Sequence, residues 1–214
     1  MNVSTSSLPS TVASSLDNPS SALSKGRSVD LALIGKTGLV RRRRRYRVYL
    51  PAGYDDQERL PVVVVLHGCK QTHLDMQRIS GFDHIADRER FIVVYPYITS
   101  HPIWRFRNCW GWWIRRQRVR GRGEIADIHQ IVASVVADFA ADPTRLHVCG
   151  LSAGAAMSVA ALASYSDVWR SGASVAGVPY GESARAVKYA RSIPVRYKPI
   201  ATLQRLLERV LLSD

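Results

Sequence analysis

A serine flanked by glycines has the clearest chemical potential in this sequence. Ser152 stands at the centre of residues 150–154, GLSAG, which fit the pattern G-x-S-x-G. A nucleophilic serine on a sharp strand-to-helix turn has a strained backbone, and the crowding of strand against helix requires small residues two positions before and after it. The motif therefore predicts that Ser152 projects from such a turn as a nucleophile. The alternative is a tight turn with an inert serine.

The segments around this motif alternate between strand-like and helix-like patterns. Runs rich in β-branched and other apolar residues predict strands over residues 46–50, 61–66, 91–95, 146–149 and 171–176. Apolar residues at helical spacing, or small residues, predict helices over 76–85, 125–136 and 153–163. This alternation predicts an α/β architecture with right-handed crossovers, in which one strand leads directly into Ser152.

Composition narrows the class of protein. The chain has 214 residues, of which 46% are hydrophobic and 22% charged, as expected for one globular domain with a tail. It contains no apolar run of about 18 residues, so no transmembrane helix is expected. Its three cysteines lack the paired spacing of a zinc site, so a structural zinc site is not expected either. The net charge of +13 permits contact with nucleic acid or acidic polymers, but we favour genome composition as the source of the arginines.

The N-terminal part differs in composition from the rest. Residues 1–30 are rich in serine and show no strand or helix period, which predicts a disordered tail. No Lys or Arg precedes Lys25 and no continuous apolar segment follows, so the start does not resemble a secretory signal. Arg41–Arg45 is expected to be solvated, with a polyanion or targeting contact as the alternative.

The stretch from Tyr46 to Gly181 resembles the polyhydroxybutyrate depolymerase family of esterases, which also covers feruloyl- and acetylxylan-esterase-like enzymes. The resemblance is carried by RVYLP at 47–51, LHGC at 66–69 with Gln71, NCWGW at 108–112, GRGE at 121–124 and VCGLSAGAAM at 148–157. It implies an α/β-hydrolase fold with a doubly wound, mostly parallel sheet. It also implies hydrolysis of carboxylic esters in hydroxyalkanoate polymers or plant-wall aromatic esters, with Ser152 as nucleophile. No metal or organic cofactor is implied, and the family suggests an extracellular location.

Two backbone amides are expected to form the oxyanion hole. The helix that begins after Ser152 leaves its first N–H groups unpaired, so the Ala153 N–H is one predicted donor. Hydrolases of this architecture take the second donor from the loop after an early strand, which places it at Cys69. We interpret His67 as a structural brace for that loop. The alternative, that His67 is the catalytic base, is disfavoured because the base follows the serine in this fold.

The cysteines and tryptophans near these motifs acquire roles from the resemblance. Cys69 and Cys109 fall in motifs that meet near the active site and would form a disulfide there; the alternative is that both are reduced and packed. Cys149 is expected to be an inert core thiol. The aromatic group Trp104, Trp110, Trp112 and Trp113, and above all Trp110 and Trp112, is predicted to line a groove for the substrate, or alternatively to cover the edge of the core.

The expected catalytic base is missing. All six histidines precede Ser152, namely His67, His73, His84, His101, His129 and His147. In α/β-hydrolases the acid and then the histidine follow the serine. The acidic residues after Ser152 are Asp167, Glu182, Glu208 and Asp214, and none follows a recognisable late strand. The sequence therefore reads as a family member truncated at the C-terminus, whose sheet lacks its last strands and whose triad acid and base are unassigned.

We accordingly divide the chain into a disordered Ser-rich tail with the arginine run (1–45), an incomplete α/β-hydrolase domain (46–183) and a divergent basic, amphipathic tail (184–214).

The first function considered is a serine-type carboxylic ester hydrolase, impaired because no histidine follows Ser152. The second is an inactive vestigial fragment that still binds an ester or polymer. The third is a basic protein that binds polyanions. The expected partner is an ester substrate, either a polyester or an aromatic ester, rather than a membrane or nucleic acid; the oligomeric state is open.

Overall fold

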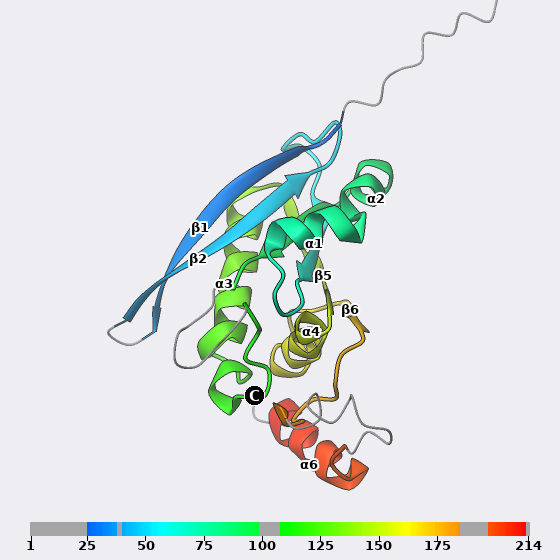
Figure 1. The fold of residues 1–214 in the computed structure, drawn as a ribbon. Helices are drawn as coiled ribbons and strands as arrows, with labels where there is room; N and C mark the ends of the chain where they lie inside the picture. The colour runs from blue at the N-terminus through cyan, green and yellow to red at the C-terminus, as the bar shows by residue number, and fades with distance from the viewer. Residues whose placement is uncertain (1–24, 38–39, 99–107, 185–196, 213–214) are drawn as a thin grey trace, which may run out of the picture.

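The computed structural model describes residues 25–37, 40–98, 108–184 and 197–212. The strands form one six-stranded sheet in the order β1-β2-β4-β3-β5-β6 (Figure 1). They are β1 (Arg27–Thr37), β2 (Val40–Leu50), β3 (Leu60–Leu66), β4 (Ile92–Pro96), β5 (Ala141–Leu151) and β6 (Ser171–Val175). The pairings β4–β3, β3–β5 and β5–β6 are parallel, whereas β1–β2 and β2–β4 are antiparallel. The predicted α/β class with a mostly parallel sheet is therefore confirmed.

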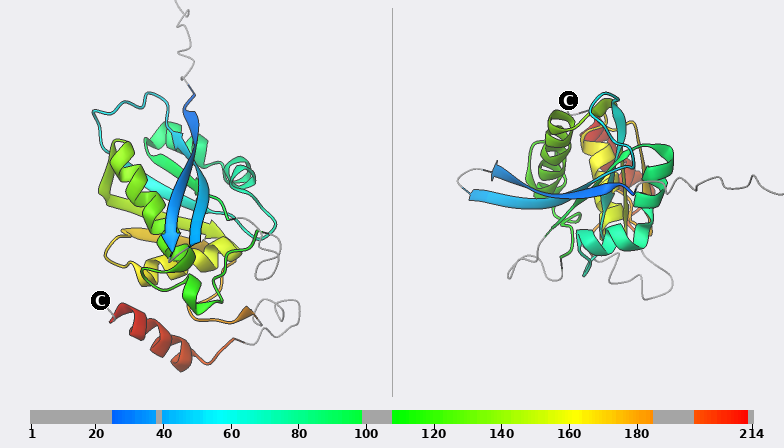
Figure 2. Two further views of the ribbon diagram at one scale, coloured as in Figure 1. Left: turned by 90° about the vertical axis from the view of Figure 1, so that its left-hand side faces the viewer. Right: turned by 90° about the horizontal axis from the view of Figure 1, so that it is seen from above.

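Helices cover both faces of the sheet. They are α1 (His73–Ser80), α2 (Phe82–Glu89), the short 3₁₀ helix η1 (Arg115–Gln117), α3 (Gly123–Asp138), α4 (Ala153–Ser164) and α6 (Ile200–Leu211). α1 and α2 pack on one face, and α3 and α4 pack on the other (Figure 2). Successive residues of β3 alternate between the two cores, as Val64 and Val65 do, because side chains of a strand point to opposite faces.

The helix predicted over 76–85 is in fact two helices. Gly81, with a φ of 69°, ends α1 and begins α2. A residue in the left-handed conformation does not continue a right-handed helix, so the apolar residues at regular spacing fall on two helices that point in different directions. Met76 is buried as a consequence, whereas Ile79 and Ile85 are exposed.

The structure corrects the prediction of a disordered tail over residues 1–45. Within that range β1 and β2 form a long twisted hairpin, with Arg27 opposite Leu50 and Thr37 opposite Val40 (Figures 1 and 2). Alternate residues of β1, namely Val29, Leu31 and Leu33, pack against the larger core. That alternation is short and ends near Gly35, which is why the sequence alone did not show a strand. Residues 1–24 lie outside the described residues.

The arginine run is part of β2, and one of its members is buried. Arg44 Nε lies 2.6 Å from an oxygen of Asp127 on α3, and the two side chains are only 11% and 5% exposed. Arg43 and Arg45 point to the opposite face of the hairpin and are exposed, because neighbouring residues of a strand face opposite ways. The expectation of a fully solvated run is therefore wrong at Arg44.

The C-terminal end of the sheet is open. β6 is an edge strand, all five of its residues are exposed, and no strand follows it within the described ranges. α6 packs beside α4 through Leu207 and Val210, in keeping with the amphipathic segment expected there. No helix in the described part of the chain is both long and apolar enough to cross a bilayer.

Candidate active site

Ser152 occupies a strained turn between β5 and α4. Its backbone has φ 56° and ψ −114°, a left-handed conformation that residues other than glycine rarely adopt. A Cβ at Gly150 would lie 2.5 Å from the carbonyl carbon of Gly154, and a Cβ at Gly154 would lie 2.2 Å from the Leu66 carbonyl oxygen. Neither position accepts a side chain. The strand-to-helix turn expected from the motif is therefore present.

A cavity of about 430 Å³ lies at this turn. Ser152 is exposed and lines it, together with Trp112, Trp113 and Tyr197. Among the described residues, no charged side chain lines the cavity. The serine hydroxyl therefore faces a mostly apolar space that is large enough for a small acyl group.

Two backbone amides border the same cavity. Cys69 and Ala153 both line it, and Ala153 is the first residue of α4. The N–H groups of these two residues donate no hydrogen bond to any other described residue. The structure thus brings the predicted pair of amides and the Ser152 hydroxyl to one space, as an oxyanion hole requires.

His67 braces the loop that carries Cys69. Its ring is fully buried; Nδ1 lies 2.8 Å from the Gly68 carbonyl oxygen, and Nε2 accepts the N–H of Ile98 at 3.3 Å. Burial lowers the pKa of His67 to about 4, so the ring is neutral near pH 7 and Nδ1 carries the proton. Because both ring nitrogens are engaged and His67 is not among the residues that line the cavity, these contacts support a structural role rather than that of a base.

A second segment of chain is fastened to this loop. Cys69 and Cys109 form a disulfide, with their Cα atoms 4.2 Å apart. The sequence left open whether these cysteines are bonded or reduced, and in the structure they are bonded. The indole Nε1 of Trp110 donates to the His67 carbonyl oxygen at 3.0 Å.

Cys149 is a free thiol in β5, and burial raises its pKa to about 11, as suits an inert core cysteine.

The two tryptophans singled out for substrate binding are both buried in the larger core, Trp110 at 2% and Trp112 at 5% exposure. Trp112 nevertheless lines the cavity, whereas Trp110 does not. Trp113, which belongs to the predicted aromatic group, lines the cavity as well, and so does Tyr197, which was not predicted to bind substrate. Trp104 lies outside the described residues. No local signal marked Tyr197, which is 45 positions from Ser152 in the chain.

No base reaches Ser152 within the described part of the chain. None of the histidines described there lines the cavity. His84 lies on a separate cavity, His129 stacks on Tyr165 at 4.3 Å, and the Nδ1 atom of His147 lies 2.8 Å from the Ser171 hydroxyl oxygen. His101 lies outside the described residues.

Two of the four acidic residues that follow Ser152, Asp167 and Glu182, are bonded to other partners, and Asp214 lies outside the described residues. Asp167 accepts two hydrogen bonds from Arg120, at 2.6 and 2.8 Å. Glu182 is buried, and its carboxylate accepts the N–H groups of Ser183 at 2.8 Å and Lys198 at 2.9 Å. Neither carboxylate is bonded to a histidine, so neither forms the acid–base pair of a triad with the described residues.

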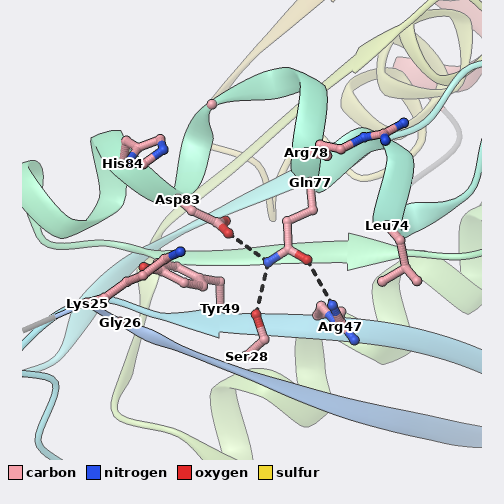
Figure 3. A pocket seen from close by; sticks show the side chains of 11 residues that line it. Lys25, Gly26, Ser28, Arg47, Tyr49, Leu74, Gln77, Arg78, Asp83 and His84 are labelled. Carbon is pink, nitrogen blue, oxygen red and sulfur yellow. Dashed lines mark hydrogen bonds between the residues drawn. The ribbon is translucent and has the colours of Figure 1, made fainter.

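A second cavity, of about 460 Å³, is polar and lies between the hairpin and α1 (Figure 3). Gln77 is at its centre: the side-chain amide donates to Ser28 at 2.9 Å and to Asp83 at 2.7 Å, and its oxygen accepts from Arg47 at 3.1 Å. Ser152 does not line this cavity. Its polar groups bond to one another and hold α1 against the hairpin, so we regard the Ser152 cavity as the candidate active site.

The sequence is similar to curated esterases. A family model described as Esterase PHB depolymerase matches residues 44–204. Poly(3-hydroxyalkanoate) depolymerase C of Paucimonas lemoignei is 39% identical over 120 residues, which cover 56% of this chain and 28% of that protein. Feruloyl esterase B of Thermothelomyces thermophilus is 30% identical over 142 residues, which cover 65% of this chain and 46% of that protein. The chain thus spans less than half the length of these relatives.

Solved structures share the fold. An acetyl xylan esterase from Aspergillus awamori matches 81% of this chain and 58% of its own, with a TM-score of 0.61 and 22% identity. An S-formylglutathione hydrolase from Agrobacterium tumefaciens matches 72% of this chain and 59% of its own, with a TM-score of 0.60 and 16% identity. These neighbours confirm the α/β-hydrolase fold. With the family model matched over 44–204, the chain belongs to the esterase PHB depolymerase family.

Proposed function

We propose that this protein is a serine-type carboxylic ester hydrolase with Ser152 as the nucleophile. One observation carries the proposal: an exposed serine on a strained turn shares an apolar cavity with two backbone amides, those of Cys69 and Ala153, which donate to no other described residue. This combination matches the requirements of acyl transfer, because it supplies a nucleophile and donors for the oxygen that becomes negative.

The reaction follows from these atoms. Ser152 Oγ attacks the ester carbonyl carbon, and the carbonyl oxygen becomes an oxyanion that accepts the N–H groups of Cys69 and Ala153. The carbon–oxygen bond to the alcohol then breaks, the alcohol leaves with a proton, and the acyl group stays on Ser152. Attack by water releases the carboxylic acid and restores the serine hydroxyl.

We also propose that the described residues perform this reaction slowly. The Ser152 proton must leave as Oγ forms its new bond, and no described histidine lines the cavity to accept it. An oxyanion hole without a working triad still gives about 10³–10⁴ over the uncatalysed rate. A low, Ser152-dependent rate is therefore the expected behaviour.

The cavity favours neutral esters with an apolar or aromatic acyl group. Trp112, Trp113 and Tyr197 line it and no charged side chain does so among the described residues, and charged groups are costly to place in such surroundings. Hydroxyalkanoate and aromatic esters, which the names of the relatives suggest, fit this requirement. The Cys69–Cys109 disulfide supports an extracellular location, because disulfides persist in oxidising compartments.

A second candidate function is ester binding without turnover. The absence of a described histidine from the cavity lining favours it, since binding needs only the apolar walls. The two functions differ in whether replacement of Ser152 changes the rate of hydrolysis.

Hydrolysis of p-nitrophenyl butyrate tests the proposal in three proteins: the wild type, Ser152→Ala and Ser158→Ala. Ser158 is a buried serine of α4 that bonds only to the Gly154 carbonyl oxygen, at 2.9 Å, so it is a matched control. We expect the wild type and Ser158→Ala to exceed Ser152→Ala, and added imidazole to widen the gap by accepting the Ser152 proton. Equal rates in all three proteins, with and without imidazole, would refute the hydrolase. Quenching of tryptophan fluorescence by the ester would then support the binding function.

A further inference from the structure

Gln71 closes the turn that carries the Cys69 amide. Its side-chain oxygen accepts the Gly68 N–H at 2.7 Å, and its own N–H donates to the Gly68 carbonyl oxygen at 3.3 Å. The N–H and the carbonyl oxygen of Gly68 are therefore both bonded to Gln71, three positions later in the chain. The turn is also strained, because Lys70 has a φ of 66°, so these bonds stabilise a conformation that the free chain would rarely adopt.

The hydrogen bonds of Gly68 set the direction of the Cys69 N–H. The Gly68 carbonyl and the Cys69 N–H belong to the same planar peptide unit and point in opposite directions. The Gly68 oxygen accepts from the Gln71 N–H and lies 2.8 Å from His67 Nδ1. With that oxygen held on one side, the Cys69 N–H points to the other side, and it donates to no described residue beside the Ser152 cavity.

Gly68 also lies directly beside the nucleophile. A Cβ at Gly68 would be 2.8 Å from Gln71 Oε1 and 3.5 Å from Ser152 Cβ. Gly68 therefore lies next to both the Gln71 carboxamide and Ser152. A shift of Gly68 away from Gln71 would change the distance between the Cys69 amide and the oxygen that forms on the substrate.

Gln71 is itself fixed by the start of α1. Thr72 is the N-cap of that helix, and its hydroxyl and backbone N–H form a capping box with Asp75. A capping box fixes the entry of the chain into the helix. The backbone next to Gln71 is therefore held locally, by the bonds between Thr72 and Asp75.

We infer that Gln71 is a positioning residue, which orients the Cys69 amide toward the substrate oxyanion by holding Gly68. This inference rests on the proposed function for its catalytic consequence. Gln71 touches neither the substrate nor Ser152 Oγ in this role, and it acts only through the backbone of Gly68.

Three variants test the role of Gln71. Gln71→Met keeps the length of the side chain but removes the acceptor, and Gln71→Glu keeps an acceptor oxygen. Gln77→Met is the matched control, because it removes the three hydrogen bonds of another glutamine, on α1, that faces the separate polar cavity. Two quantities are measured in each: kcat and KM for p-nitrophenyl butyrate, and the exchange rate of the Gly68 amide proton by NMR.

In Gln71→Met we expect kcat to fall by about tenfold or more with KM within about twofold, because a misplaced oxyanion donor weakens binding of the transition state and not of the substrate. Exchange of the Gly68 amide should accelerate by about tenfold or more in Gln71→Met. It should stay slow in Gln71→Glu, which should also recover part of kcat. Gln77→Met should leave both quantities within about twofold of the wild type.

Two results would overturn the inference. One is equal Gly68 exchange in the wild type and Gln71→Met. The other is lost protection in Gln71→Met with kcat unchanged. If the wild type shows no hydrolysis that depends on Ser152, the proposed function fails, and the exchange rates alone then decide whether Gln71 holds Gly68.

Discussion

Removal of the Cys69–Cys109 disulfide should affect both stability and the oxyanion hole. The bond joins residues 40 positions apart, and closing a loop of that length lowers the entropy of the unfolded chain by the equivalent of about 4 kcal/mol at 25 °C. The double variant Cys69→Ser/Cys109→Ser should therefore lose up to about 4 kcal/mol of unfolding free energy. For a chain of this size, that loss lowers Tm by roughly 8–16 °C.

The catalytic effect has a separate cause. The Cys69 amide would remain, but its loop would lose its covalent link to the neighbouring segment and keep non-covalent contacts such as the hydrogen bond from Trp110 to the His67 carbonyl oxygen. We expect kcat for the Ser152-dependent reaction to fall by about tenfold or more. Urea unfolding and the p-nitrophenyl butyrate assay measure the two effects on the same preparation.

Cys149→Ala is the control for loss of a cysteine without loss of the disulfide. Cys149 is a free thiol in β5, and removal of its sulfur should cost about 1 kcal/mol with kcat unchanged. The reasoning is refuted if the double variant stays within about 1 kcal/mol of the wild type and retains its kcat. A loss of stability with full kcat would refute only the link to the oxyanion hole.

Three further predictions concern stability. Arg44→Met should cost about 3–5 kcal/mol, because it leaves Asp127 as an unpaired buried charge, whereas Arg43→Met should change urea unfolding by less than about 0.5 kcal/mol. Gly150→Ala should prevent formation of a soluble, cooperatively unfolding protein, because its Cβ would meet backbone atoms at 2.5 Å; a normal thermal transition would contradict this. Burial lowers the pKa of His67 to about 4, so His67 takes up a proton more readily in the unfolded chain. The free energy of unfolding, measured by urea titration, should therefore fall by about 3 kcal/mol as the pH drops from 6.5 to 4. A free energy of unfolding that does not change over this range would contradict the burial of His67 as a neutral ring.

The turn that carries Ser152 was predictable from the sequence, because its conformation depends on residues that are neighbours in the chain. A serine between two glycines at the end of a strand requires the turn around Ser152, and the crowding at Gly150 and Gly154 confirms the reason. The Ala153 amide was expected at the start of the helix after Ser152, whereas the Cys69 amide was expected only because hydrolases of this architecture take their second donor from that loop; both line one cavity.

Features that depend on distant contacts were missed. Residues 27–45 lack the apolar content of a typical strand, and their hairpin is stabilised by packing on α3 and by a buried partner for Arg44, which only the folded chain reveals. Trp110 and Trp112 are the same residue type and both pack in the core, yet only Trp112 lines the cavity, while the indole of Trp110 bonds to the His67 carbonyl oxygen. Tyr197 reaches the cavity only because the chain returns to it after β6.

The open edge at β6 has a consequence for the behaviour of the protein at high concentration. The strand Ser171–Val175 carries no lysine or proline, and its residues are small and exposed. Exposed strands of this kind are templates on which another molecule can add its own backbone. Copies of the described fold should therefore associate edge to edge as their concentration rises, unless another polypeptide segment occupies that side.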